Sequence, residues 1–273
     1  MKLTEMKQVL ASGQIQLTKS LGQNFLHDGN QLRRIVEAAA LTKSDQVLEV
    51  GPGLGPLTEL LVERAGEVLA VEKDRRLFDF LQTRFAAAKS LTLVCDDALD
   101  WLRREPRDWS GWKLVANLPY SVASPILVEL AQAKGCPQRI VATLQLEVGQ
   151  RLVAKADDDD YGVLSLLMQL RYEPQGHLKI PAECFFPAPD VDSACVVLVR
   201  REQPLLPYEE HAAFERLVKL GFSQRRKMMM KLLKRDWPVD RLEDAFQQLG
   251  LSPQIRAEKV TLEQFVQLTQ SLK

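Results

Sequence analysis

The segment Asn117-Leu118-Pro119-Tyr120 combines residue types that could bind and orient an aromatic amine, and it follows the predicted strand Lys113–Ala116. The exocyclic amine of adenine is a poor nucleophile because its lone pair is delocalised into the ring. An Asn side-chain oxygen and the backbone oxygen before Pro could accept both amine hydrogens and aim the lone pair at an electrophilic methyl group. The Tyr120 ring could stack on an extruded base. Asn and Pro also favour turns, but the position at a strand end favours the chemical interpretation.

A glycine-rich loop follows the first predicted strand, with the sequence Glu49-Val50-Gly51-Pro52-Gly53-Leu54-Gly55. Glycines allow a sharp turn and a close approach of the backbone to a ligand, and the next helix offers free N–H groups. Pro56 occupies the position of the third glycine of a dinucleotide fingerprint, so the loop suits a ligand without a pyrophosphate. An ordinary tight turn is the alternative.

Two carboxylates follow the next two predicted strands. Glu72 could accept hydrogen bonds from both hydroxyls of a ribose, and Asp97 could accept one from the exocyclic amine of an adenine. The alternative for Glu72 is an exposed surface residue beside Lys73. The alternative for Asp97 is the N-cap of a helix that begins at Ala98. Because these features share one edge of one sheet in the appropriate order, together they favour an adenosyl ligand.

The elements that must position these residues alternate between short strands and longer helices. The predicted strands are Gln46–Val50, Val68–Glu72, Leu91–Cys95, Lys113–Ala116, Arg139–Leu146 and Cys195–Arg200. The predicted helices between them are Leu57–Arg64, Arg75–Lys89 and Pro125–Lys134, the last with Ser124 as N-cap. This pattern predicts an α/β fold with a mainly parallel sheet, helices on both faces and ligands at the carboxyl ends of the strands.

Strand signals end near Glu202–Pro207, which predicts a second, smaller domain. The segments that follow are predicted to be helical: His211–Gly221, Gln224–Lys234, Val239–Leu249 and Leu262–Leu272. We therefore expect an α/β domain over residues 1–203, with the N-terminal segment 1–44 packing on it, and an all-helical domain over residues 204–273.

Charge is balanced over the 273 residues, because 36 Lys and Arg oppose 36 Asp and Glu. This excludes a uniformly basic nucleic-acid binder but allows a local basic surface. No acidic residue interrupts the basic residues between positions 216 and 235. Those predicted to contact a phosphate backbone are Arg225, Arg226, Lys227, Lys231 and Lys234. A solvated helix face is the alternative.

The four Cys residues include no CxxC pair, and the three His residues have no carboxylate or Cys partner at ligand spacing. We therefore predict no metal site and a reduced, cytoplasmic protein. No run of about 18 apolar residues predicts a membrane span.

Several segments, in order, resemble the KsgA-type small-subunit rRNA adenine dimethyltransferases, which are class I methyltransferases that use S-adenosylmethionine. The resemblance begins at Lys19 and extends almost to the end of the chain. Its motifs are Lys19–Leu26, Glu49–Gly55, Asn117–Tyr120, Phe185–Ser193, Gly221–Lys227 and Arg256–Glu258. It implies a Rossmann-like sheet and a monomer that dimethylates two adjacent adenines near the 3′ end of small-subunit rRNA, within a pre-30S-like particle.

The resemblance also implies roles for individual residues. The implied cofactor contacts are Asn24, Leu26, Gly51, Glu72, Asp97 and Asn117, of which Asn24 and Leu26 depend on the resemblance alone. The implied catalytic residues are Asn117, Leu118, Pro119, Tyr120 and Phe185. Phe185 is expected to stack on the target base opposite Tyr120, whereas the neighbouring Phe186 is expected to pack.

Two other functions remain open from the sequence. The first is an Erm-type methyltransferase of large-subunit rRNA, which has the same chemistry and a different target. The second is a non-catalytic assembly or transcription factor on the same fold. The segments Phe185–Ser193 and Gly221–Lys227 favour the small-subunit enzyme over the first, and the intact Asn117–Tyr120 loop favours an active enzyme over the second.

Overall fold

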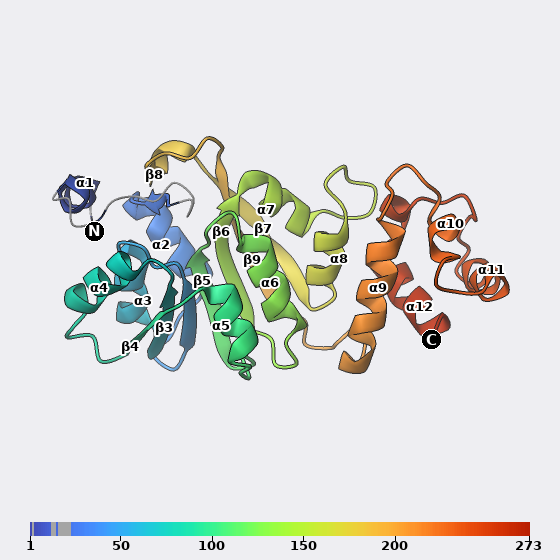
Figure 1. Cartoon of the computed structure of the whole chain (residues 1–273), viewed down its shortest axis with the longest axis horizontal. Helices are drawn as coiled ribbons and strands as arrows, with labels where there is room; N and C mark the ends of the chain where they lie inside the picture. The colour runs from blue at the N-terminus through green and yellow to red at the C-terminus, as the bar shows by residue number, and fades with distance from the viewer. Residues whose placement is uncertain (2, 12–14, 16–22) are drawn as a thin grey trace. The chain divides into compact units, whose positions relative to one another are not determined.

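The computed structural model describes residues 1, 3–11, 15 and 23–273, so the Lys19–Gly22 part of the first motif lies outside the described residues. The described chain forms two compact units (Figure 1). The first contains Met1–Gly149 and Pro174–Arg200, and the second contains Gln150–Glu173 and Arg201–Lys273. One division, at Arg200, lies close to the predicted domain boundary at residue 203.

A seven-stranded sheet forms the centre of the first unit. Its strands are β2 (Gln46–Val50), β3 (Glu67–Glu72), β4 (Leu91–Cys95), β5 (Trp112–Asn117), β6 (Arg139–Gln145), β7 (Tyr172–Ile180) and β9 (Ser193–Arg200). The spatial order is β4-β3-β2-β5-β6-β9-β7. The pairs from β4 to β6 are parallel, and β9 pairs antiparallel with β6. The mainly parallel sheet predicted from the sequence is confirmed.

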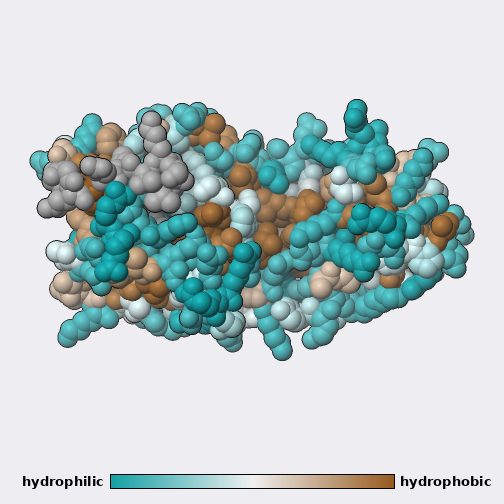
Figure 2. All heavy atoms as spheres, viewed as in Figure 1, coloured by the Kyte–Doolittle hydropathy of each residue, from teal (hydrophilic) through white to brown (hydrophobic). Residues whose placement is uncertain are grey.

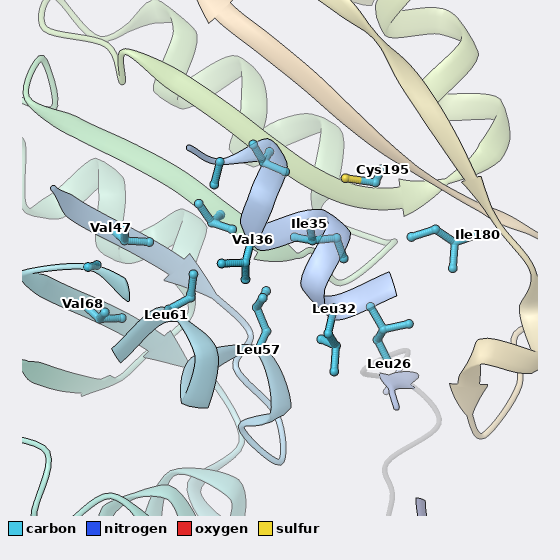
Figure 3. Packing of buried hydrophobic residues seen from close by; sticks show 14 of the residues in the cluster. Leu26, Leu32, Ile35, Val36, Val47, Leu57, Leu61, Val68, Ile180 and Cys195 are labelled. Carbon is cyan, nitrogen blue, oxygen red and sulfur yellow. The ribbon is translucent and has the colours of Figure 1, made fainter. Parts of the chain in front are cut away.

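Helices pack against this sheet because both of its faces are apolar. The helices of the first unit are α1 (Leu3–Ala11), α2 (Gly29–Ala38), α3 (Pro56–Arg64), α4 (Arg75–Arg84), α5 (Ala98–Arg104) and α6 (Ala123–Gln132), and the division between the units falls in the middle of α7 (Leu146–Val153). In Figure 3, side chains of α2 such as Leu32 and Val36 lie beside Leu57 of α3 and near Val47 of β2. The next strand residue, Leu48, is also fully buried, and side chains alternate between faces along a strand. Both faces of the sheet are therefore covered.

The start of α6 differs from the prediction. The helix begins at Ala123, so Ser124 lies inside the first turn and is not the N-cap. The loop before the helix continues directly into it, since the Val122 N–H donates to the Pro119 carbonyl at 3.1 Å and the Ile126 N–H donates to the Val122 carbonyl at 3.0 Å. The start of α6 is thus stabilised by these backbone hydrogen bonds and not by the expected hydrogen bond to the Ser124 side chain.

The second unit is built from helices. They are α8 (Val163–Gln169), α9 (His211–Gly221), α10 (Met229–Leu233), α11 (Val239–Gln248) and α12 (Leu262–Ser271). The helix α10 is shorter than the predicted Gln224–Lys234, because the Lys227 N–H bonds the Gln224 carbonyl in a turn before the helix starts. Phe222 and Phe265 stack with their ring centroids 6.0 Å apart.

Residues 150–173 belong to the second unit, although the prediction assigned them to the first domain. The Tyr161 ring lies 6.0 Å from the Phe222 ring, and its hydroxyl donates to the Val260 carbonyl at 3.0 Å. The Asp157 N–H also donates to the Glu258 carbonyl at 2.9 Å. The two hydrogen bonds join residues about 100 positions apart and the ring pair joins residues 61 apart, which a reading of local patterns cannot detect.

Truncating Leu61 should strongly destabilise the first unit. This α3 residue is fully buried in the cluster of Figure 3, so Leu61→Ala leaves a cavity and should cost about 2–5 kcal/mol in the free energy of unfolding. Leu60, on the same helix, is only partly buried and provides a matched control. Urea titrations should therefore show a larger loss for Leu61→Ala than for Leu60→Ala, and equal losses would contradict this packing.

Candidate active site

A cavity of about 160 Å³ lies at the carboxyl ends of β2, β3 and β5. In the sheet, β3 lies on one side of β2 and β5 lies on the other. The strand order therefore reverses next to β2, which makes this a topological switch point. Ligands of open α/β sheets bind at such a switch point. The predicted site residues that line the cavity are Asn24, Leu26, Gly51, Glu72, Asp97, Asn117, Leu118, Pro119 and Tyr120.

The glycine loop forms one wall of the cavity with a backbone that favours glycine. Gly51, Gly53 and Gly55 have φ angles of 70°, 62° and 80°, values that L-residues with side chains rarely adopt. A Cβ atom on Gly53 would lie 2.7 Å from the Phe25 ring. The loop is therefore shaped both by its turn and by the close approach of β1 (Phe25–Leu26).

Glu72 ties this loop to the end of β3. Its Oε2 accepts from the Gly53 N–H at 3.0 Å, and its Oε1 accepts from the Asp74 N–H at 2.9 Å. Burial raises the pKa of this carboxyl, while the backbone hydrogen bonds from Asp74 and Gly53 oppose the rise. The side chain is thus held in one orientation at the cavity wall, where its oxygens could also receive hydroxyl groups of a ligand.

Asp97 serves as the N-cap of α5 while it lines the cavity. Its Oδ1 accepts from the N–H groups of Leu99 and Asp100, at 2.9 and 3.2 Å. Its Oδ2 lies 2.8 Å from the Lys73 ammonium, and the hydrogen bond from Lys73 lowers the pKa of the carboxyl despite partial burial. The capping alternative is therefore correct, and it holds the carboxylate at the cavity.

Asn117 presents an oxygen that the protein leaves unpaired. Its Nδ2 donates to the Asn24 carbonyl at 3.0 Å. Its Oδ1 is buried and has no hydrogen-bond partner within the described part of the chain. Since a buried acceptor without a partner is costly, this oxygen suits a ligand that brings an N–H donor.

The backbone around Asn117 is fixed by neighbouring strands. The Leu118 N–H donates to the Thr143 carbonyl of β6 at 2.9 Å, and the Pro119 carbonyl accepts from Val122 at the start of α6. Tyr120, which lines the cavity, is half-buried, and burial raises the pKa of its hydroxyl. The loop is therefore held at both ends before any ligand binds.

Phe185 is the one predicted catalytic residue that the structure does not bring to the cavity. It belongs to the two-residue strand β8 (Phe185–Phe186), which pairs antiparallel with β1 so that Phe185 lies opposite Leu26 and Phe186 opposite Phe25. Paired residues share a face, and Phe185 is buried with Leu26 in the core at 2% exposure. Its stacking role stays a prediction, one that would require the ring to leave this core.

Phe186, which was expected to pack, is the less buried of the two rings. Neighbouring strand residues point to opposite faces, and Phe186 therefore shares its face with Phe25, which lines the cavity. The Lys7 ammonium of α1 lies 5.4 Å from the centroid of the Phe186 ring. The Phe186 ring is therefore more exposed than the Phe185 ring, although the β1 partners of both, Phe25 and Leu26, line the cavity.

Sequence reasoning missed Glu49 as a residue of the site. Its side chain is 1% exposed, lines the cavity, and has an Oε2 without a partner among the described residues. Burial raises its pKa to about 8, and the charge of Glu72 adds to the rise. The available signal was a carboxylate in the middle of an otherwise apolar strand.

The basic residues predicted to bind RNA are all exposed, in the second unit. A cavity of about 500 Å³ is lined by Arg226, Lys227 and Lys231, and Figure 2 shows hydrophilic side chains over much of the visible face of this unit. Within the described chain, these three residues and Lys234 form no ion pair. The Arg225 guanidinium donates to the Asp159 carbonyl at 3.0 Å.

Some basic residues of the segment 216–235 form ion pairs with acidic residues. Arg216 pairs with Asp236 at 2.8 Å, and Lys219 pairs with Glu215 one helical turn before it. The free positive charge is therefore concentrated at positions 226–234. Over the residues that the structure covers, no group of three or more His, Cys, Asp or Glu could hold a metal ion, and no helix has the length and apolarity of a membrane span.

A methyl group on Gly53 should destabilise the protein. Gly53→Ala places a Cβ against the Phe25 ring and forces Ala into the left-handed region, which should cost about 2 kcal/mol or more. Gly111 provides the control, because its Cβ would meet only Gln46 at an ordinary 3.8 Å. Urea unfolding of both variants checks this, and equal stability of Gly53→Ala and wild type would show that the loop is not so constrained.

Glu49 should make the stability of the ligand-free protein fall with rising pH. Its folded pKa of about 8 lies above the ordinary value of 4.5, so the folded state binds more protons than the unfolded state between these pH values. Stability is therefore lost as pH rises through this window. Urea titrations at pH 5 and 8.5 should show that the free energy of unfolding of Glu49→Gln, relative to that of wild type, increases with pH. A difference that stays constant or decreases would contradict the raised pKa.

Comparisons with known proteins find relatives over most of the chain. A family model described as ribosomal RNA adenine dimethylase matches residues 14–273. A Geobacter sulfurreducens protein named ribosomal RNA small subunit methyltransferase A is 38% identical over 264 residues, covering 94% of this chain and 96% of its own. A Moorella thermoacetica protein of the same name is also 38% identical, with coverage of 93% and 92%.

Two solved structures have similar folds. The 23S rRNA methyltransferase ErmE is 30% identical with a TM-score of 0.71, over 91% of this chain and 99% of that one. A dimethyladenosine transferase from Plasmodium falciparum is 24% identical with a TM-score of 0.75, over 89% and 95%. The predicted Rossmann-like fold and the predicted enzyme class are confirmed, and the chain belongs to the ribosomal RNA adenine dimethylase family of methyltransferases.

Proposed function

We propose that this enzyme transfers methyl groups from S-adenosylmethionine to the exocyclic amines of two adjacent adenines near the 3′ end of small-subunit rRNA. The observation that carries the proposal is the amide of Asn117, whose nitrogen is bonded to Asn24 while its buried oxygen has no partner in the described chain. This oxygen can accept one hydrogen of an adenine amine. The names of the relatives in Geobacter and Moorella support the small-subunit target.

The residues around the cavity fit S-adenosylmethionine, which supplies an electrophilic methyl group when bound. Glu72 would hold the ribose hydroxyls, and Asp97 would accept from the adenine amine of the cofactor. Gly51 and Gly53 allow the loop to bend around the cavity and to approach Pro119 and Phe25, at positions where a Cβ would lie 3.2 and 2.7 Å from those side chains. Asn24, Leu26 and Asn117, which also line the cavity, would complete the cofactor contacts.

The loop that follows β5 would orient the target base. The Asn117 oxygen would accept one amine hydrogen and the Leu118 carbonyl the other, which favours a tetrahedral nitrogen with its lone pair aimed at the methyl group. Pro119 fixes the turn, and the Tyr120 ring would stack on the base, a contact worth about 1–3 kcal/mol. The surplus proton would leave to water or to a backbone oxygen, so no side-chain base is needed.

We further propose a division of labour along the chain. Residues 1–203 would carry out methyl transfer, and the helical domain of residues 204–273 would bind RNA through Arg225, Arg226, Lys227, Lys231 and Lys234. The exposed, unpaired charges at positions 226–234 support this, because phosphate contacts by Lys and Arg dominate RNA affinity. The substrate would be rRNA within a pre-30S-like particle, bound by a monomer in the cytoplasm.

Methylation of large-subunit rRNA is the second candidate function. It is favoured by one observation, the 30% identity to the 23S rRNA methyltransferase ErmE over most of both chains. The higher identity to the small-subunit enzymes favours the first candidate. Mapping methylated adenines in both rRNAs, with and without the gene, separates the two candidates and would also reveal a protein without catalytic activity.

Replacing Asn117 should nearly abolish methyl transfer. Asn117→Ala removes the proposed acceptor, and loss of one such contact to the reacting group should lower kcat by about 100-fold or more. The measurement is transfer of labelled methyl groups from S-adenosylmethionine to unmodified small-subunit particles. Asn30 supplies the control, since this exposed amide accepts from its helix neighbour Arg33 and Asn30→Ala should leave the rate unchanged. Full activity of Asn117→Ala would disprove the mechanism.

Replacing Lys231 should weaken RNA binding and its dependence on salt. Lys231→Ala removes one proposed phosphate contact, so the slope of log affinity against log salt should fall in magnitude by roughly 0.7–1. Lys259→Ala makes the same change in net charge within the same unit, but this ammonium pairs with Asp157 and should leave the slope nearly unchanged. Equal slopes for wild type and Lys231→Ala would place the RNA elsewhere.

A further inference from the structure

A hydrogen bond connects the catalytic loop to a distant strand. The Tyr120 hydroxyl lies 2.6 Å from the Ser193 Oγ, and either oxygen can be the donor. The two residues are 73 positions apart in the chain. Tyr120 lines the cavity, whereas Ser193 is fully buried as the first residue of β9.

The strand end that carries Ser193 is itself firmly held. Ser193 pairs with Gln145 of β6. The preceding residue, Asp192, accepts from the Ala182 N–H through Oδ1 at 3.0 Å and from the Leu146 N–H through its carbonyl at 3.0 Å. The Asp192 Oδ2 also pairs with the Lys179 ammonium at 2.7 Å. The Ser193 hydroxyl is therefore a fixed point against which a mobile ring could be held.

Tyr120 needs such a point because its backbone alone does not set its ring. The bonds that fix the loop involve the Leu118 N–H and the Pro119 carbonyl, which leaves the Tyr120 side-chain torsions free. A ring that stacks on an extruded base contributes most when its plane is set before the base arrives, since ordering a side chain on binding costs affinity. A bond at the far end of the ring, the hydroxyl, restrains χ1, and because a phenolic O–H prefers to lie in the ring plane, the direction of the bond also favours one orientation of that plane.

We infer that Ser193 is a positioning residue for methyl transfer, which holds the Tyr120 ring in the plane that receives the target adenine. This inference rests on the proposed function, in which Tyr120 stacks on the base. It also gives a role to the last residue of the segment Phe185–Ser193, whose first residue lies in the core. Ser193 itself touches neither base nor cofactor in this role.

A double-mutant cycle tests the inference. Ser193→Ala and Tyr120→Phe should each lower kcat for methylation of unmodified particles by roughly fivefold, the equivalent of one net hydrogen bond, with unchanged affinity for S-adenosylmethionine. Because the bond is already absent in Tyr120→Phe, adding Ser193→Ala to that variant should cause no further loss. Titration calorimetry with the cofactor and thermal unfolding accompany each rate.

Ser165 provides the matched control, since its buried hydroxyl also makes a 2.6 Å bond, to the Arg151 carbonyl in the second unit. Ser165→Ala should lower stability without slowing methyl transfer in excess of the unfolded fraction. The inference is overturned if Ser193→Ala keeps the full kcat, or if the losses from Ser193→Ala and Tyr120→Phe multiply. In either case an inactive Asn117→Ala variant would leave the proposed function intact, whereas an active one would remove the basis of both.

Discussion

A carboxamide can present either a donor or an acceptor to a ligand, and the chemistry available at Asn117 depends on which one it presents. The Asn24 carbonyl decides this by taking the Asn117 Nδ2 at 3.0 Å, which leaves the Oδ1 as the group without a partner in the described chain. The reverse orientation would offer hydrogens to an amine that already carries two. A backbone atom of the N-terminal segment thus determines how a side chain 93 positions later can act.

The same dependence on distant segments runs through the whole site. The loop after β5 is fixed by β6 through Thr143, the glycine loop is fixed by β3 through Glu72, and Tyr120 is bonded to β9 through Ser193. Each of these partners belongs to a strand of one sheet. A rigid sheet places functional groups more precisely than loops alone could, which explains why the proposed reacting groups lie at strand ends.

The parallel strands and the residues that follow them could be predicted from the sequence, because the signal is local. β-Branched runs of five or six residues and the polar residue after each run, such as Glu72 or Asp97, need no knowledge of the fold. Phe185 could not be placed in this way. Its face is set by the two-residue pairing of β8 with β1, across 160 positions of chain, and a two-residue strand has no periodicity to detect. The Tyr161–Val260 bond, which joins the two chain segments of the second unit, is equally non-local.

A net charge of zero is compatible with RNA binding because the charges are sorted by position in the fold. Two carboxylates of the site are committed to the backbone or to a nearby cation, Glu72 to Gly53 and Asp97 to Lys73. In the second unit, Asp236 and Glu215 neutralise Arg216 and Lys219, while the cations at positions 226–234 remain exposed. Over a Debye length of about 8 Å, a phosphate responds to these nearest charges and hardly to the sum over the chain. The positive surface is therefore limited to the cations at positions 226–234 that the described chain leaves unpaired. The position of this surface, more than the total charge of the protein, would determine how RNA binds.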